Sequence, residues 1–493
     1  MSTENKDLGF IGLLKSFTQP FWVASAMELF ERWAWYGLFA VLALYLTGST
    51  DEGGLGFTHV ERGEIMSYVT FILYLLPLVT GAISDKIGYK LSLVIAYLLL
   101  GFGYYYMGEV TSYNAVFLMF LVVAVGAAIF KPVASAIVTK STDERNSSFG
   151  FGVFYMMVNI GGFFGPLFSG KLREIYGWKI VFIMAASAIA VNMLLVLLFF
   201  KEPNREKSTD SFGQTILKSL RNIWEALSDM KLTLLLVIMV GFWLMFNQLF
   251  YTLPVFIEEW VDTKVLYNSL HNILPGVADF YKNSEGGINP EQVVNMDAFF
   301  IVVLQMLIST IILKWKPINA MMSGIFIAII GIALSFYTNN IFYTLIGILI
   351  FAIGEMTSNP KFSDYIAKIS PKGKEALYMG TYFLPIAIAN LLTKWITGDL
   401  YEKLSDKVLF IRDALSKRNV QLPEINQDYT KNDFYTEAAN NLGMGQNEMT
   451  KFIWDTYHPS RIWYVIAGIG LLTIIGLFVY NAVIASRIKK GKV

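Results

Sequence analysis

Long apolar runs recur along the whole chain, and they constrain its fold more than any other feature. Each has roughly 18–25 residues, enough for a helix to cross about 30 Å of hydrocarbon. Only 16% of the 493 residues are charged, whereas soluble domains carry about 25%. These runs predict an all-α polytopic membrane protein with twelve transmembrane helices. They lie near 21–47, 60–84, 90–108, 114–139, 149–170, 179–200, 232–257, 297–314, 319–337, 341–367, 376–398 and 462–486.

Basic residues gather in alternate connections and predict the orientation, because cytoplasmic loops are enriched in lysine and arginine. This set comprises Lys86, Lys90, Lys201, Arg205, Lys207, Lys218, Arg221, Lys231, Lys314, Lys316, Lys368, Lys372, Lys374, Arg487, Lys489, Lys490 and Lys492. All of them lie on one side if the N-terminus is cytoplasmic, so we expect both termini inside. The absence of cysteine and of a cleavable signal peptide suits a multi-pass protein of a bacterial inner (plasma) membrane.

Several function classes find no support in the sequence. The three histidines are widely separated and cysteine is absent, which argues against a metal site. The HExxH, GxSxG and GxxxxGK[ST] patterns are missing, so we expect neither an enzyme nor a cofactor. A formal net charge of +1 gives no indication of nucleic-acid binding. The expected surroundings are the lipid bilayer and a small substrate.

A charged stretch at 201–231 divides the chain into two sets of six helices, at 1–200 and 232–493. The layout resembles the major facilitator fold, in which the substrate site lies at the midplane between two halves. The second half contains two polar segments, 258–296 and 401–460, which we expect outside the cytoplasm. Segment 401–460 is long for a plain connector. We expect it to hold short amphipathic helices around Lys403–Leu415 and Asp433–Leu442.

Three charges lie inside the first apolar run. Glu28, Glu31 and Arg32 share one helical face with Trp35, because their spacing is i, i+3, i+4 and i+7. An ionised side chain at the bilayer centre costs at least about 2.5–3.5 kcal/mol. Charges that snorkel from a helix end are the alternative, but apolar residues flank the cluster on both sides. The cluster therefore predicts paired charges that face a wet cavity.

The run Glu28-Leu-Phe-Glu-Arg-Trp-Ala-Trp-Tyr-Gly37 resembles the ExxERFxYYG signature of the proton-dependent oligopeptide transporter family, also called the peptide transporter family. Phe154–Gly161 resembles its FYxxINxG element, Gly354–Pro360 its GExxxxP element and Met379–Leu384 its MGxWFL segment. The resemblance covers nearly the whole chain. It implies a proton-coupled symporter that imports di- and tripeptides by alternating access.

The resemblance also implies roles for individual residues. Proton coupling falls to Glu28, Glu31 and Glu355. Substrate binding falls to Arg32, Trp35, Tyr36, Tyr68, Lys131, Tyr155, Asn159, Trp243, Asn247, Glu355 and Tyr382. The turn Gly81–Lys90 is similar to the major-facilitator loop signature, which gives Asp85 and Lys86 a gating role, although an ordinary charged turn would look alike. Asn159 is also a candidate for a hydrogen bond between helices. The spacing of Gly161 and Gly165 predicts close helix packing.

Charge counting suggests how coupling would work. A lone lysine such as Lys131 needs a compensating carboxylate, and Glu355 is the expected partner. Glu28, Glu31 and Glu355 against Arg32 and Lys131 then leave one excess negative charge, which one proton neutralises. Our hypothesis is that protonation of the first-helix cluster frees Arg32 for a peptide carboxylate, which it can bind bidentately. Lys131 would exchange between that carboxylate and Glu355.

The chain departs from the family pattern where the family carries a charged pair at its outer gate. Phe39 replaces the arginine and Asn247 the glutamate, so a whole ion pair is absent. Asp297 is a gating candidate, though it also fits a helix N-terminal acid that the dipole stabilises. Trp35 adds bulk where the family has tyrosine. The sequence therefore does not identify the residues that would bind the amino group of a substrate.

Two alternatives remain. The same scaffold could carry another small substrate, such as an amino acid, a modified peptide or an organic anion, and the changes at Phe39 and Asn247 are the main support for that. A non-transporting membrane protein that docks a protein partner on 401–460 is the other. The buried charges of the first helix weigh against it, because a scaffold has no need of them.

Overall fold

The computed structural model describes residues 10–143, 146–202, 211–312, 314–371, 375–426 and 428–489, and these form helices and connecting loops. No strand forms within these ranges; a single antiparallel bridge joins Lys282 to Ile288. Some basic residues that predict the orientation lie outside the described part, namely Arg205, Lys207, Lys372, Lys374, Lys490 and Lys492.

Six spans form the first half. They are α2 (Gln19–Thr47), the pair α3 (His59–Leu75) and α4 (Pro77–Ile87), α5 (Tyr89–Met107), α6 (Tyr113–Lys140), α7 (Ser147–Tyr176), and α8 (Lys179–Leu194) with the π-helix η2 (Leu195–Phe199). A short helix α1 (Phe10–Ser16) precedes them. The second span bends by 47° between α3 and α4. Pro77 starts α4 there, and its missing N–H prevents an unbroken helix.

Six more spans form the second half. They are α10 (Met230–Tyr251) with α11 (Leu253–Trp260), α15 (Met296–Ile311), α16 (Pro317–Tyr337), α17 (Ile341–Ile369), the series α18 (Glu375–Gly380), α19 (Phe383–Lys394) and the π-helix η3 (Trp395–Leu400), and α24 (Ile462–Lys489). The predicted twelve-span, all-α major facilitator fold is confirmed.

Simple hydropathy recognises most of these spans. Eight described helices are individually long and apolar enough to cross a bilayer, and the bent α3–α4 pair makes a ninth. The other three depart from the simple pattern for visible reasons. Helix α2 carries three charges, α15 has 16 residues, and α19 breaks into a π-helix.

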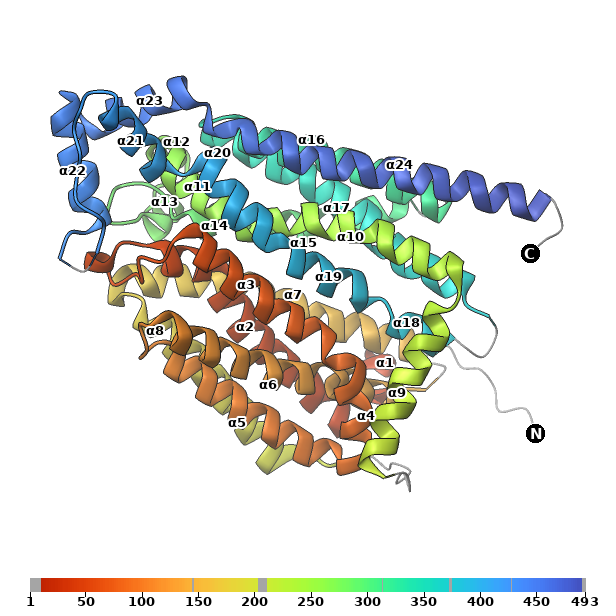
Figure 1. The fold of residues 1–493 in the computed structure, drawn as a ribbon. Coiled ribbons are helices and arrows are strands. Elements are labelled where there is room, and N and C mark those ends of the chain that lie inside the picture. Colours follow the sequence, from red (N-terminus) through yellow and green to blue (C-terminus); the bar gives the residue numbers. More distant parts are fainter. Residues whose placement is uncertain are drawn as a thin grey trace, which may run out of the picture.

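The remaining helices lie at the two ends of the bundle (Figure 1). One end, the terminal end, carries α1, the end of α24 and the amphipathic linker helix α9 (Phe212–Leu227). The other end carries η1 (Thr50–Glu52), α12 (Lys264–Ile273), α13 (Pro275–Tyr281) and α14 (Pro290–Val294). It also carries a group that we call the crown, α20 (Tyr401–Ser405), α21 (Lys407–Ser416), α22 (Lys431–Leu442) and α23 (Gln446–Tyr457). Helices α20–α21 and α22 occupy the places where the sequence predicts amphipathic helices.

Glycines on α7 allow α2 to approach very closely. A Cβ added at Gly161 would lie 2.5 Å from the carbonyl oxygen of Leu29 and 2.8 Å from Cβ of Arg32. One added at Gly165 would lie 2.6 Å from the carbonyl oxygen of Trp33. Small residues at such a contact let two backbones pack directly. The predicted packing role of the pair is confirmed, and the contact fixes the face of α2 that carries the charges.

Candidate functional site

The charges of α2 form one buried cluster. Arg32 Nε donates to Glu31 Oε2 at 2.6 Å and lies 3.4 Å from Glu28 Oε1. All three side chains are buried, and Glu31 is completely so. The guanidinium carbon of Arg32 lies 5.6 Å from the ring centre of Tyr36, one turn further along the helix. The sequence-predicted pairing within this face of α2 is therefore present.

Lys131 on α6 joins this cluster instead of pairing with Glu355. Its ammonium lies 4.3 Å from the ring centre of Tyr74, a cation–π distance. It is within Coulombic range of Glu28, Glu31 and Arg32. No ion pair joins Lys131 to Glu355 in the described part of the chain, which differs from the expected pair. Glu28, Glu31, Arg32 and Lys131 together carry no net charge when all are ionised.

Glu355 on α17 lies instead within the electrostatic reach of Asp297 on α15. Helices α15 and α17 pack against each other, which brings the two carboxyl groups together. Asp297 Oδ1 and Glu355 Oε2 are both buried without a hydrogen-bond partner among the described residues. Asp297 stands in the first turn of α15 but is buried in the bundle. Two carboxyl groups therefore lie near each other between helices of the second half.

Predicted substrate-binding residues lie on helices of both halves. On α7, Tyr155 is 57% exposed, and Asn159 Nδ2 donates to the carbonyl oxygen of Tyr155 at 2.9 Å. On the second half, the Trp243 and Tyr382 rings meet edge to face at 6.5 Å. Trp243 Nε1 has no hydrogen-bond partner among the described residues, and Tyr382 donates to Asn359 Oδ1 at 2.7 Å.

Trp35 is placed differently from these residues. It is buried between Phe39 and Phe120, with ring centres 5.1 and 6.1 Å away. The extra bulk of this tryptophan is therefore taken up by aromatic packing inside the first half.

Neutral contacts occupy the positions where the family pattern has a charged gate pair. The Phe39 ring meets the Tyr251 ring edge to face at 5.2 Å. Asn247 Nδ2 donates to Asn390 Oδ1 at 3.0 Å. The Tyr251 hydroxyl lies 2.7 Å from Asn390 Oδ1 and 2.8 Å from Thr70 Oγ1. Since Phe39 and Thr70 belong to the first half, these contacts join the two halves.

Three further contacts between the halves involve residues that the sequence reasoning missed. Lys394 on α19 donates to the Tyr68 hydroxyl, with its ammonium 4.6 Å from that ring centre. The fully buried Arg62 on α3 donates to Thr397 Oγ1 at 2.9 Å. Arg173 Nη2 on α7 lies 3.1 Å from Glu291 Oε1 on α14. A lone lysine within an apolar run was a usable signal for Lys394, as it was for Lys131.

The halves also touch through backbone at the crown end. A Cβ added at Gly63 on α3 would lie 3.1 Å from Cα of Gly398 in η3. A π-helix widens one turn of the helix and is frequent at functional sites. The structure is therefore closed between the halves at the crown end.

The predicted gating turn lies at the terminal end. The Tyr89 hydroxyl donates to Asp85 Oδ1 at 2.6 Å, and the backbone N–H of Tyr89 donates to Glu202 Oε1 at 2.8 Å. Gly88 separates α4 from α5 with φ +109°, a conformation that L side chains rarely adopt. Lys86 is partly buried in the same turn.

Known proteins match this arrangement. The sequence profile of the Major Facilitator Superfamily matches residues 21–393. The chain belongs to the Major Facilitator Superfamily. It is thus a multi-pass membrane transporter rather than an enzyme.

Two individual transporters are similar to this chain in sequence. The chain is 32% identical over 194 residues to the uncharacterized transporter YclF of Bacillus subtilis (strain 168), covering 38% of this chain and 37% of that protein. It is 23% identical over 460 residues to dipeptide and tripeptide permease A of Escherichia coli (strain K12), covering 81% of this chain and 88% of the permease. The aligned part thus spans less than half of the first of these two relatives.

Solved structures share the fold. A crystal structure of a POT family transporter in complex with 5-aminolevulinic acid superposes with a TM-score of 0.64 at 18% identity. It covers 92% of this chain and 98% of that transporter. The resemblance to the peptide transporter family, which the motifs of α2, α7 and α17 predict, is confirmed by these likenesses.

Proposed function

We propose that this chain is a proton-coupled symporter that imports di- and tripeptides by alternating access. We place it in a bacterial inner membrane with its terminal end, and so both termini, in the cytoplasm. The observation that carries the proposal is the buried Arg32, held by Glu31 at 2.6 Å and by Glu28 at 3.4 Å. A buried guanidinium with two exchangeable carboxylates is a site for a third carboxylate, that of a peptide C-terminus.

The cluster gives protonation a direct effect on substrate binding. When a proton enters Glu28 or Glu31, the protonated carboxyl loses its charge and its hold on Arg32 weakens. The guanidinium then gains by pairing with the incoming carboxylate. Lys131 lies within Coulombic range of the same groups and would share the substrate carboxylate. Exchange of Lys131 with Glu355, as the sequence predicts, would need another conformation.

The second half supplies the other end of the proposed site. Asp297 and Glu355 bring two carboxyl groups near each other on the second half. One of them can hold a proton while the other accepts the amino group of a peptide. Trp243 and Tyr382 stand beside this region with apolar surface for side chains.

Uptake by reconstituted protein tests the proposal. When the external pH is lower than the internal pH, labelled dialanine is expected to accumulate in proteoliposomes. A protonophore should abolish this accumulation. Liposomes without protein provide the background. Equal uptake in both would exclude the proposed activity.

A different small substrate is the second candidate, favoured by the neutral contacts of Phe39 and Asn247. These replace a charged pair near the amine side of the site, so recognition of a peptide amine has weaker support than recognition of a carboxylate. The superposed POT family transporter was crystallised with 5-aminolevulinic acid, which has one carboxylate and one amine. Thermal shifts with dipeptides, amino acids and organic anions separate the two candidates, because ligands that bind the folded state raise Tm.

We expect Asp297→Asn to lower proton-driven uptake about 10-fold or more, the change that corresponds to about 1.4 kcal/mol. The substitution keeps the size of the side chain but removes its proton site and the charge next to Glu355. Initial rates with and without a pH gradient measure the effect. Asp428→Asn, on an exposed loop of the crown, is the matched control. Near-normal uptake by Asp297→Asn would mean that the residue only stabilises the start of α15.

A further inference from the structure

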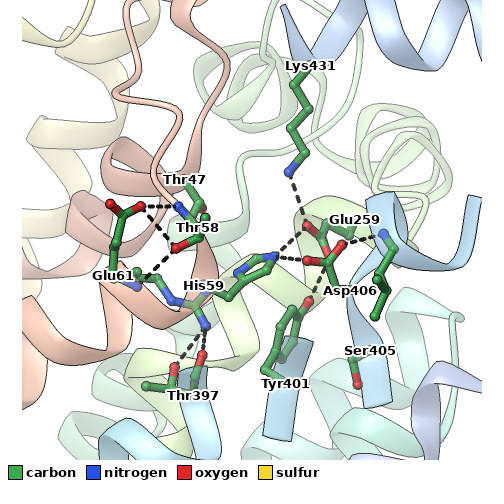
Figure 2. A network of polar contacts seen from close by, with 12 residues as sticks. Thr47, Thr58, His59, Glu61, Glu259, Thr397, Tyr401, Ser405, Asp406 and Lys431 are labelled. Carbon is green, nitrogen blue, oxygen red and sulfur yellow. Dashed lines mark hydrogen bonds and ion pairs between the residues drawn. The ribbon is translucent and has the colours of Figure 1, made fainter. Parts of the chain in front are cut away.

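A second group of buried charges lies outside the site just described, at the crown end (Figure 2). His59, on the first turn of α3, is at its centre, and its Nε2 lies 3.3 Å from Glu259 Oε1 and 3.5 Å from Asp406 Oδ2. Lys431 Nζ lies 3.2 Å from Glu259 Oε1, and the Tyr401 hydroxyl donates to Glu259 Oε2 at 2.9 Å. His59 and Glu259 are each only 5% exposed.

The group draws on three parts of the chain. His59 belongs to the first half and Glu259, on α11, to the second. Tyr401, Asp406 and Lys431 belong to the crown, the segment between α19–η3 and α24. Figure 2 shows Lys431 above the His59–Glu259 contact, Asp406 to its right and Tyr401 below it, so that crown residues surround this contact.

The crown is attached firmly to the second half. The indole N–H of Trp260 donates to the carbonyl oxygen of Ser405 at 2.9 Å, and Ser405 Oγ donates to the carbonyl oxygen of Pro459 at 2.7 Å. Lys407 Nζ donates to the carbonyl oxygen of Glu259 at 3.1 Å. Covalent continuity with η3 and α24 adds to these contacts, so the crown must move with the second half.

The crown also contacts the first half. The buried Tyr401 ring lies 4.6 Å from the His59 ring and 5.2 Å from the guanidinium carbon of Arg62. Besides the Asp406–His59 contact, Asn432 Nδ2 donates to Glu52 Oε1 at 2.7 Å and lies 3.3 Å from Asp51 Oδ2. Both acceptors belong to η1, the loop helix between α2 and α3. These contacts cross the gap that has to widen if the two halves separate at this end.

The charges are arranged so that the closed form is electrostatically satisfied. Two basic groups lie beside the buried Glu259 carboxylate, with His59 Nε2 at 3.3 Å and Lys431 Nζ at 3.2 Å from Oε1. A buried charge that loses its partner is strongly destabilising. If the first half moves away and takes His59 with it, Glu259 still pairs with Lys431 of the crown. The second half can therefore move without leaving the Glu259 carboxylate unpaired.

We propose that the crown is a built-in clamp on the gate at this end: Asp406 and Asn432 grip the first half and stabilise the closed form, while Lys431 and Tyr401 keep Glu259 paired when it opens. The inference rests on the proposed alternating access, but not on which substrate is carried. In this proposal the partner of segment 401–460 belongs to the same chain, namely the first half at the crown end.

Distance measurements between spin labels test the clamp. The chain has no cysteine, so Thr111→Cys and Asn339→Cys introduce one label site in each half. Both are exposed, in the loops that follow α5 and α16 at the crown end. In the parent pair a short distance, the closed form, should dominate. Adding Asp406→Asn and Asn432→Ala should shift a substantial part of the population to a longer distance.

The design separates a clamp from general damage. Asp406 Oδ1 also accepts the backbone N–H of Leu409 at 3.0 Å and caps α21, and asparagine retains that capping ability while losing the charge. Asn432→Ala alone, at an exposed contact, should give a smaller shift in the same direction. Asp428→Asn, on the exposed loop before α22, should leave the distribution unchanged.

Each outcome has a defined meaning. Unchanged distances in the double variant would overturn the proposal, as would an equal shift with Asp428→Asn. A chain that fails to move dialanine but still shows the shift would contradict the proposed peptide uptake and leave the clamp standing. Unaltered melting of the labelled variants confirms that the shift comes from gating.

Discussion

Glu31→Gln is expected to abolish proton-driven uptake while leaving the protein folded. Glu31 is fully buried and accepts a hydrogen bond from Arg32 Nε at 2.6 Å. The amide cannot take up a proton and holds the guanidinium without a charge of its own. Glu28 Oε1, 3.4 Å from Arg32 Nε, still balances the guanidinium charge, so we expect the variant to fold. Acid-driven accumulation of dialanine in proteoliposomes measures the loss.

Exchange experiments distinguish lost coupling from lost folding. Glu31→Gln should still exchange labelled for unlabelled substrate across the membrane when no gradient is applied, because alternation needs no net proton movement. Glu424→Gln, whose side chain is 89% exposed on the crown, is the matched control and should transport normally. Full acid-driven accumulation by Glu31→Gln would contradict the role of this cluster in coupling.

Gly161→Leu is expected to destabilise the first half and to stop transport. The added Cβ alone would lie 2.5 Å from the carbonyl oxygen of Leu29 and 2.8 Å from Cβ of Arg32. Overpacking of a tight contact costs about 1–3 kcal/mol, and a contact between backbones has little room to relax. Melting in detergent should occur at lower temperature, and the charge cluster of α2 should be displaced.

Gly468→Leu on α24 provides the comparison. A Cβ at Gly468 meets no atom within 4 Å, so the same substitution should change melting little. Similar destabilisation by both variants would point to a general cost of removing glycine from a helix. A much larger effect at Gly161 would assign the cost to the α2–α7 contact.

The spans and the charged face of α2 could be predicted from the sequence because both depend on local spacing. The length of an apolar run shows whether a helix can cross the bilayer, and charges one helical turn apart must lie on one side of a helix. The same holds for Gly161 and Gly165, whose spacing predicted close helix packing, although only the structure shows that the partner is α2. Helix α1 and the linker helix α9 were not predicted, since short amphipathic helices at a membrane surface lack a long apolar run.

Partners on different helices were harder to predict. Lys131 was expected opposite Glu355, yet it lies over Tyr74, and Glu355 lies near Asp297. Which charge meets which depends on the rotation and offset of packed helices, and a sequence pattern along one helix does not contain these. The substitution of an ion pair at Phe39 and Asn247 was visible in sequence, but the aromatic and amide contacts that replace it were not.

The amino-acid sequence alone determined the membrane setting, the twelve spans and the paired charges of α2, because hydrophobic length and helical period act within a segment. Tertiary structure alone decided where the crown lies. Lys431 and Glu259 are separated by 172 positions and meet at 3.2 Å because the crown packs against the second half. Contacts of that range follow from the packing of whole helices, to which no single segment of sequence is a guide.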